Sequence, residues 1–428
     1  MRPVDSARTS PPESADTARA RLVGELRQRG SPVLSRPAAQ AFARVPRHVF
    51  VPEVGAAAAY RDEALVIKCE PDGTPVSSSS QPAMMAIMLD QLGLEPGHRV
   101  LEIGTGSGYN AAVMSAVVGP DGEVVSIDID PELVGRARAS LAAAGFDAVR
   151  VVCADGGYGD PDGAPYDRII VTAGAWDIAP AWLEQLAPGG LLVVPLSLRG
   201  LQLSVALRRQ PGRSGAEEWT STSAWRCGFV RMLGAFAGPE RPVRETGQLP
   251  LVAQMADGRA VDGPGLQAAL AGPVVDVPLA LALSGPADLA DLDLWLTFAA
   301  LSLDRVVILA APGDWFPLAP LLPLGALVSS PTEAENLGVA TLLPADIGRG
   351  AATSPPEAQL MIRGFGPGGG HLATSLAGRA ATWAELGRPG AADLQLAVRL
   401  RTDNDAASPS APVVLRRPSV VIEAGWTP

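Results

Sequence analysis

The sequence predicts an α/β fold, a doubly wound Rossmann-like sheet that is followed by an additional C-terminal α+β domain. Three observations support this prediction. An apolar strand runs directly into a glycine-rich turn and a helix, a second strand ends in an aspartate, and apolar strands then continue to alternate with helices. Such alternation is typical of a parallel sheet that is covered by helices.

The first strand and its turn lie in residues 99–109, RVLEIGTGSGY, and a helix is expected over 111–118. Three glycines let the backbone approach a ligand closely and adopt positive φ: Gly104, Gly106 and Gly108. The segment therefore predicts a site for a nucleotide-like cofactor. The dinucleotide fingerprint fits only loosely, because in the register that starts at Gly104 the third small residue is replaced by Tyr109.

Acidic residues accompany three of the predicted strands. Glu102 lies inside the first strand, where a carboxylate is costly unless it faces a cationic or amine-bearing ligand or the loop amides. Asp128 ends the strand over 123–127 and is placed to accept both hydroxyls of a ribose. The alternative is that Asp128 caps the helix at Pro131, although Asp130 is better placed for that. Asp155 follows a strand over 148–152, where it could accept from an adenine amine. These features fit NAD as well as S-adenosylmethionine.

A run of serines precedes another predicted helix. Residues 77–82 read SSSSQP, and the apolar run 83–92 follows, with Pro82 in the first helical turn. Free amides and a serine hydroxyl at the positive end of a helix predict an anion site. The alternative is that Ser80 only caps the helix.

Seven segments in fixed order carry a resemblance to a known family: residues 45–52, 60–62, 78–82, 100–109, 155–159, 165–173 and 185–190. On these segments, residues 44–196 resemble the protein-L-isoaspartate O-methyltransferase family, within the class I fold that uses S-adenosylmethionine. The resemblance implies that Ser80 and Ser78 contact the substrate. Two segments depart from the family pattern where substrate would enter, namely residues 68–76 and 173–176.

The resemblance implies two sets of binding residues. The cofactor set is Glu102, Gly104, Thr105, Gly106, Ser107, Gly108, Asp128, Ile129, Asp155, Gly156 and Thr172. The substrate set is Ser79, Gln81, Ala173, Gly174 and His48. No metal is implied.

Carboxyl methylation agrees with the scarcity of candidate bases. A carboxylate with a pKa of roughly 4 is already an anion at neutral pH, so that its attack on a sulfonium methyl needs no general base. The chain has only three histidines, His48, His98 and His371. In-line positioning in a dry pocket is then what the enzyme must supply.

Composition bounds the remaining possibilities. We expect a disordered lead over 1–18, a methyltransferase domain over 19–238 and a further domain over 239–428, because 428 residues exceed one domain. A formal charge of −11 with a single lysine, Lys68, argues against a nucleic-acid partner. No run approaches 18 apolar residues and no signal core is present, so no membrane partner is expected. Three cysteines without metal-ligand spacing fit the cytoplasm.

The added domain shapes the functional prediction. Long homologues with such an extension resemble tailoring methyltransferases of ribosomally made modified peptides, which methylate an aspartate side chain that then cyclises to an aspartimide. A modified precursor peptide is therefore the predicted partner, and repair of isoaspartyl-containing polypeptides is the alternative. An NAD-dependent oxidoreductase would need an acid/base residue that the sequence does not offer. A silent peptide-binding module would have lost the cofactor residues, which are all present.

Overall fold

The computed structural model describes residues 13–28, 34–71, 73–211, 217–239, 243–246, 250–255, 263–283, 286–299, 304–310, 325–328, 339–344, 359–402 and 413–426. The chain divides into two compact units. The first contains Met1–Gly174, Ala179–Val194 and Phe229–Ala235. The second contains Ala175–Ile178, Pro195–Gly228 and Phe236–Pro428.

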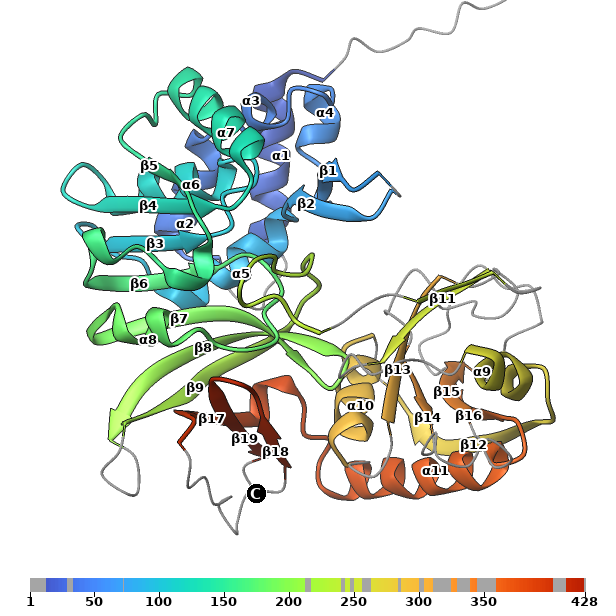
Figure 1. The fold of residues 1–428 in the computed structure, drawn as a ribbon. Coiled ribbons are helices and arrows are strands. Elements are labelled where there is room, and N and C mark those ends of the chain that lie inside the picture. Colours follow the sequence, from blue (N-terminus) through green and yellow to red (C-terminus); the bar gives the residue numbers. More distant parts are fainter. Residues whose placement is uncertain are drawn as a thin grey trace, which may run out of the picture. The chain divides into compact units, whose positions relative to one another are not determined.

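A parallel sheet forms the centre of the first unit (Figure 1). Its strands follow the order β7-β6-β3-β4-β5, and their bounds are β3 (Arg99–Ile103), β4 (Glu123–Asp128), β5 (Arg150–Cys153), β6 (Tyr166–Val171) and β7 (Leu186–Leu198). Residues of β7 up to Val194 belong to this unit. Val100, Leu101 and Ile127 are fully or almost fully buried, as expected for strands covered on both faces. The predicted doubly wound sheet is thus confirmed.

The helices of the unit are α1 (Ala15–Gln28), α2 (Arg36–Arg44), α3 (Arg47–Phe50), α4 (Ala56–Ala59), α5 (Pro82–Leu92), α6 (Tyr109–Val118), α7 (Pro131–Ala143) and α8 (Pro180–Glu184). Helices α5, α6 and α7 contact strands of the parallel sheet, and the helices nearer the N-terminus pack on these. A two-stranded antiparallel hairpin, β1 (Leu65–Cys69) and β2 (Pro75–Ser79), carries the serine run. Short 3₁₀ turns follow β5, over Gly156–Tyr158 and Pro161–Gly163.

Two element boundaries differ from the sequence prediction. Helix α1 already begins at Ala15, because the Ser14 hydroxyl accepts the Thr17 amide at 3.2 Å and Ala18 is fully buried. The predicted disordered lead is therefore wrong for Ala15–Ala18, and residues 1–12 lie outside the described residues. The sequence predicts a helix over 182–190, but strand β7 already starts at Leu186, where it pairs with Tyr166. The Pro188-Gly189-Gly190 sequence is a poor helix former.

The second unit contains two antiparallel sheets. One follows the order β8-β9-β17-β19-β18, with β8 (Leu201–Pro211), β9 (Glu217–Arg226), β17 (Leu394–Leu400), β18 (Val413–Arg416) and β19 (Val420–Trp426). The other follows the order β10-β11-β13-β14-β15-β16-β12. Its strands are β10 (Val243–Thr246), β11 (Pro250–Met255), β12 (Val274–Ala282), β13 (Asp304–Ala310), β14 (Gly325–Val328), β15 (Val339–Pro344) and β16 (Gln359–Phe365).

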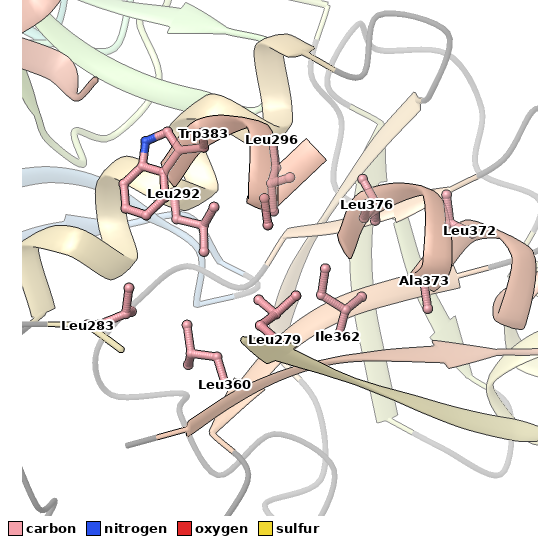
Figure 2. Packing of buried hydrophobic residues seen from close by; sticks show 11 residues of the cluster. Leu279, Leu283, Leu292, Leu296, Leu360, Ile362, Leu372, Ala373, Leu376 and Trp383 are labelled. Atoms are coloured by element: carbon pink, nitrogen blue, oxygen red, sulfur yellow. The ribbon is translucent and has the colours of Figure 1, made fainter. Parts of the chain in front are cut away.

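Three helices accompany the seven-stranded sheet: α9 (Gly263–Leu270), α10 (Pro286–Ala299) and α11 (Gly369–Glu385). Figure 2 shows the core that α10 and α11 form over β12 and β16, with leucines and Ile362 gathered on one side of these elements. The sequence predicts a helix over 371–386 with Trp383 facing inward, and Trp383 of α11 is indeed fully buried in this core. A helix was expected over 294–303, and its last residues, 300–303, lie outside the described residues.

The predicted single boundary near Pro239 does not separate the two units. Strand β17 pairs with β9 through Ala397 opposite Thr220 and Val398 opposite Trp219, so a segment near the C-terminus completes the sheet that β8 and β9 begin. Residues 195–228 and 236–428 consequently share one unit. Among the described residues, no helix is both long and apolar enough to cross a bilayer, and no cluster of side chains suited to a metal ion is found.

Candidate functional site

A cavity of about 110 Å³ that opens to solvent lies at the carboxyl ends of β3, β4 and β6 in the first unit. This is the edge of a parallel sheet at which ligands bind in doubly wound folds. The glycine turn after β3 forms one wall, and the serine run forms another. Residues Val230–Leu233 return to the cavity from a distant part of the sequence.

The glycine turn is fixed by contacts that require its backbone geometry. Gly104 has a φ of +105°, and a Cβ at this position would lie 2.7 Å from the Thr172 Oγ1. That hydroxyl donates to the Gly104 carbonyl at 2.7 Å. Gly104, Thr105, Gly106, Ser107 and Thr172 all line the cavity, as the sequence implied, whereas Gly108 faces Ala137 of α7. The turn therefore presents backbone to a ligand at close range.

Glu102 is fully buried at the floor of the cavity. It accepts hydrogen bonds from Asn110 Nδ2 at 2.7 Å and from Ser126 Oγ at 2.6 Å. Burial raises the pKa of Glu102 to about 7, although both hydrogen bonds lower it. A cationic ligand above this carboxyl group would favour its ionised form. Asn110 was not predicted, and its place in the first turn of α6 brings it to Glu102.

Asp128 lies at the end of β4 and lines the cavity with Ile129. Its two oxygens accept the amides of Gly106 at 2.9 Å and Asp130 at 3.0 Å. Burial raises its pKa. Asp130 is the residue that caps α7, since it accepts the amides of Glu132 and Leu133. The capping alternative for Asp128 is therefore wrong, and its carboxylate faces the cavity.

Gly156 lines the cavity, whereas its neighbour Asp155 does not. The indole of Trp182 donates to the Gly156 carbonyl at 2.8 Å. The Asp155 carboxylate accepts the amides of Gly157 at 2.9 Å and Ala235 at 2.7 Å. The predicted contact of Asp155 with an adenine amine stays a prediction, and what the structure adds is that Asp155 anchors the segment that contains Ala235.

The serine run lines the opposite side through Ser77, Ser78, Ser79 and Ser80. Ser79 is 2% exposed, and its hydroxyl has no hydrogen-bond partner among the described residues. Such a buried hydroxyl is costly unless a ligand or water satisfies it. Ser80 does not cap α5, because the N-cap residue is Gln81 and no side-chain cap bond is formed there. The capping alternative for Ser80 is therefore wrong.

Asp62 already occupies the predicted anion site at the start of α5. It accepts the Ala83 amide at 2.8 Å through Oδ1 and the Gln81 amide side chain at 3.1 Å through Oδ2. The prediction of free amides at this helix end is therefore wrong for the Ala83 amide, because the Asp62 carboxylate, from a loop 21 residues away in sequence, already binds it. Gln81 does not line the cavity and instead ties the loop to Asp62.

Arg47 supports the serine run from behind. Its side chain is fully buried, and it donates to the carbonyls of five residues. Nη1 reaches Ala59 at 2.8 Å and Arg61 at 3.0 Å, while Nη2 reaches Glu63 at 3.1 Å, Ser79 at 3.3 Å and Ser80 at 3.0 Å. Burial lowers its pKa, but an arginine remains charged at neutral pH. This residue holds the backbone that presents the serines.

The remaining predicted substrate residues divide into two groups. Ala173 lines the cavity. His48 does not: its Nδ1 lies 2.9 Å from the Tyr60 hydroxyl. Gly174 also stays outside, since its amide donates to the Val230 carbonyl at 2.8 Å and its carbonyl accepts the Met232 amide at 2.9 Å. The sequence predicts a strand over 225–232 and gives no signal that Val230–Leu233 line the cavity. In the structure that strand, β9, ends at Arg226 and the residues after it reach the cavity.

Comparison with known proteins shows which family the N-terminal half of the chain resembles. Residues 17–230 match the model of the protein-L-isoaspartate(D-aspartate) O-methyltransferase family. A protein-L-isoaspartate O-methyltransferase of Methanopyrus kandleri is 47% identical over 227 residues, which cover 52% of this chain and 95% of that protein. Protein-L-isoaspartate O-methyltransferase 2 of Archaeoglobus fulgidus is 43% identical over 221 residues, which cover 52% of this chain and 95% of that protein.

Solved structures of the same name are also similar. One protein-L-isoaspartate O-methyltransferase has a TM-score of 0.48 and 24% identity, and covers 89% of this chain and 96% of its own. Another, from Plasmodium falciparum in complex with S-adenosyl-L-homocysteine, has a TM-score of 0.42 and 19% identity. The match covers 50% of this chain and 97% of the Plasmodium chain.

Proposed function

The chain belongs to the protein-L-isoaspartate(D-aspartate) O-methyltransferase family, and on this premise we propose that it methylates the free carboxylate of isoaspartyl residues in polypeptides. It is a carboxyl O-methyltransferase that depends on S-adenosylmethionine. The observation that carries the proposal is the pairing, in one cavity, of a cofactor wall at the glycine turn and Asp128 with an acceptor wall of four serines.

The cavity residues fit S-adenosylmethionine by their chemistry. The exposed backbone of the glycine turn suits close approach of a ligand, and the Asp128 carboxylate keeps free lone pairs for ribose hydroxyls. The Asn110 Oδ1 has no partner among the described residues and, beside Glu102, would accept from an ammonium group. When bound, the cofactor supplies an electrophilic methyl group.

The acceptor side needs only to bind and orient an anion. No histidine, lysine or cysteine is among the described residues that line the cavity, which suits an acceptor that is already ionised. Ser80 and Ser78 offer hydroxyl donors to its oxygens, and Arg47 fixes the Ser80 backbone from behind. Exclusion of water by Met85 and Leu133, which also line the cavity, would strengthen attraction between opposite charges.

Methylation of a synthetic isoaspartyl peptide by the full chain tests the proposal. The expected product carries one added methyl group by mass spectrometry, while the matching peptide with an ordinary aspartate remains unmodified. Failure to methylate the isoaspartyl peptide, with binding of S-adenosylhomocysteine intact, would contradict the proposed acceptor.

A second candidate is tailoring of a ribosomally made modified peptide, with an aspartimide as the product. The observation that favours it is the large part of the chain beyond residue 230, which the family match does not include. Incubation with a constrained peptide that contains aspartate distinguishes the two: tailoring predicts a methyl ester that then expels methanol, so that the final product has lost one water relative to the unmodified peptide. We also keep a cytoplasmic location as a proposal, which the free state of Cys69, Cys153 and Cys227 supports.

A further inference from the structure

The charged side chains that line the cavity are unevenly divided by sign. Three are carboxylic acids, Glu102, Asp128 and Asp130, and Arg231 is the only cation among the described residues of the lining. Lys68, the single lysine of the chain, does not line the cavity. It pairs with Asp130 at 2.6 Å and with Glu132 at 2.7 Å. A carboxylate-bearing acceptor approaches a chain with a formal charge of −11, so one local cation has a large effect on its binding.

The backbone on both sides of Arg231 is fixed within the first unit. Gly174 bonds to Val230 and Met232, and it forms a parallel bridge with Arg231. Further along, Gly234 has a φ of +90°, and a Cβ there would lie 2.4 Å from the Asp155 carboxylate. Met232 is buried, whereas Arg231 itself is exposed. Its side chain is therefore available to a ligand while little backbone entropy remains to be lost on binding.

Arg231 is held next to the end of β6, at a residue that the sequence assigned to the substrate set, Gly174. Its bridge partner Gly174 directly follows Ala173, which lines the cavity after the end of β6. The family match ends at residue 230, one position before Arg231. The residue thus belongs to the part of the cavity that the family match leaves out.

The chemistry of methyl transfer limits what Arg231 can bind usefully. Attack of a carboxylate on a sulfonium methyl removes one negative and one positive charge in the transition state. A cation on the reacting carboxylate would stabilise the ground state more than the transition state and so slow the reaction. A cation beside the site contributes when it binds a second carboxylate, on a neighbouring residue of the acceptor.

We propose that Arg231 is a specificity-determining residue that pairs with such a neighbouring carboxylate, so that isoaspartyl residues in acidic segments are the preferred acceptors. This inference rests on the proposed function. An ion pair of exposed groups changes affinity by up to about fivefold, and a like-charge pair acts in the opposite direction.

Three isoaspartyl peptides that differ only in their flanking residues test the inference. Glutamate, glutamine or lysine is placed on both sides of the isoaspartate, and kcat and KM are measured with the full chain and its variants. We expect the wild type to favour the glutamate peptide over the lysine peptide about tenfold in kcat/KM, mainly through KM. The ratio should fall to about one in Arg231→Ala, recover in Arg231→Lys and invert in Arg231→Glu.

Arg27→Glu is the matched control, because it changes net charge equally on an exposed face of α1 outside the cavity lining. Its ratio should equal that of the wild type. If Arg231→Glu keeps the wild-type ratio, the inference is wrong even though isoaspartyl peptides are methylated. If the wild type methylates none of the three peptides, the proposed function itself fails.

Discussion

Replacement of Arg47 by lysine should loosen the serine run, residues 77–80, while the glycine turn after β3 stays intact. The arginine makes five hydrogen bonds to backbone carbonyls, and a lysine ammonium has three donors. At least two carbonyls around the fully buried side chain therefore lose their partner. Since each buried group left unsatisfied costs about 1–3 kcal/mol, the loss for two is about 2–6 kcal/mol.

Amide hydrogen exchange is the suitable measurement, because a chain with two compact units does not give one well-defined free energy of unfolding. Protection should fall in residues 59–63 and 79–83 of Arg47→Lys, while the β3 and β4 amides keep theirs. KM for an isoaspartyl peptide should rise at least tenfold, and affinity for S-adenosylhomocysteine should stay within about twofold.

The matched control is Arg36→Lys, the same chemical change at an exposed position of α2. It should leave exchange and KM unchanged. Equal exchange protection in Arg47→Lys and Arg36→Lys would show that the five carbonyls do not depend on the arginine, and the reasoning would be refuted.

Three further changes address individual residues of the cavity. Asp128→Ala should weaken binding of S-adenosylhomocysteine by about 1–3 kcal/mol in calorimetry, because a charged acceptor for the ribose is lost; unchanged affinity would contradict this role. Burial raises the pKa of Glu102 from 4.5 to about 7, so the carboxyl group stabilises the fold below pH 4.5 and this contribution is lost as the pH rises to 7. Between these pH values the wild type should lose about 3 kcal/mol of stability relative to Glu102→Gln, measured by amide hydrogen exchange of β3 in the ligand-free protein; parallel pH profiles would contradict the shift. Ser80→Ala should lower kcat about 10- to 1000-fold with cofactor affinity preserved, and full specific activity would remove Ser80 from the site.

Local sequence predicted the glycine turn and Asp128, which the structure brings together at the cavity. Apolar strands, glycines that need positive φ and aspartates at strand ends are features of a few consecutive residues, and each was found close to where it was expected. Asp130 was even identified as the better cap of α7, because capping depends only on the residues next to a helix start.

The serine side of the cavity depended on contacts between distant segments. Asp62 fills the start of α5 across 21 residues, and Arg47 reaches Ser80 across 33. Val230–Leu233 reach the cavity where Gly174 pairs with Val230 and Met232 and Asp155 accepts the Ala235 amide. Nothing in the local pattern of any of these segments indicates its partner.

Domain organisation shows the same division on a larger scale. The sequence indicated that an added region follows the family-like part, yet it placed one boundary near Pro239. The structure instead pairs β17 with β9, residues that lie about 175 positions apart, as in the bond from the Leu396 amide to Ser221. Propensity and periodicity act over one element, whereas strand pairing is decided by which edge remains unpaired when the whole chain has folded.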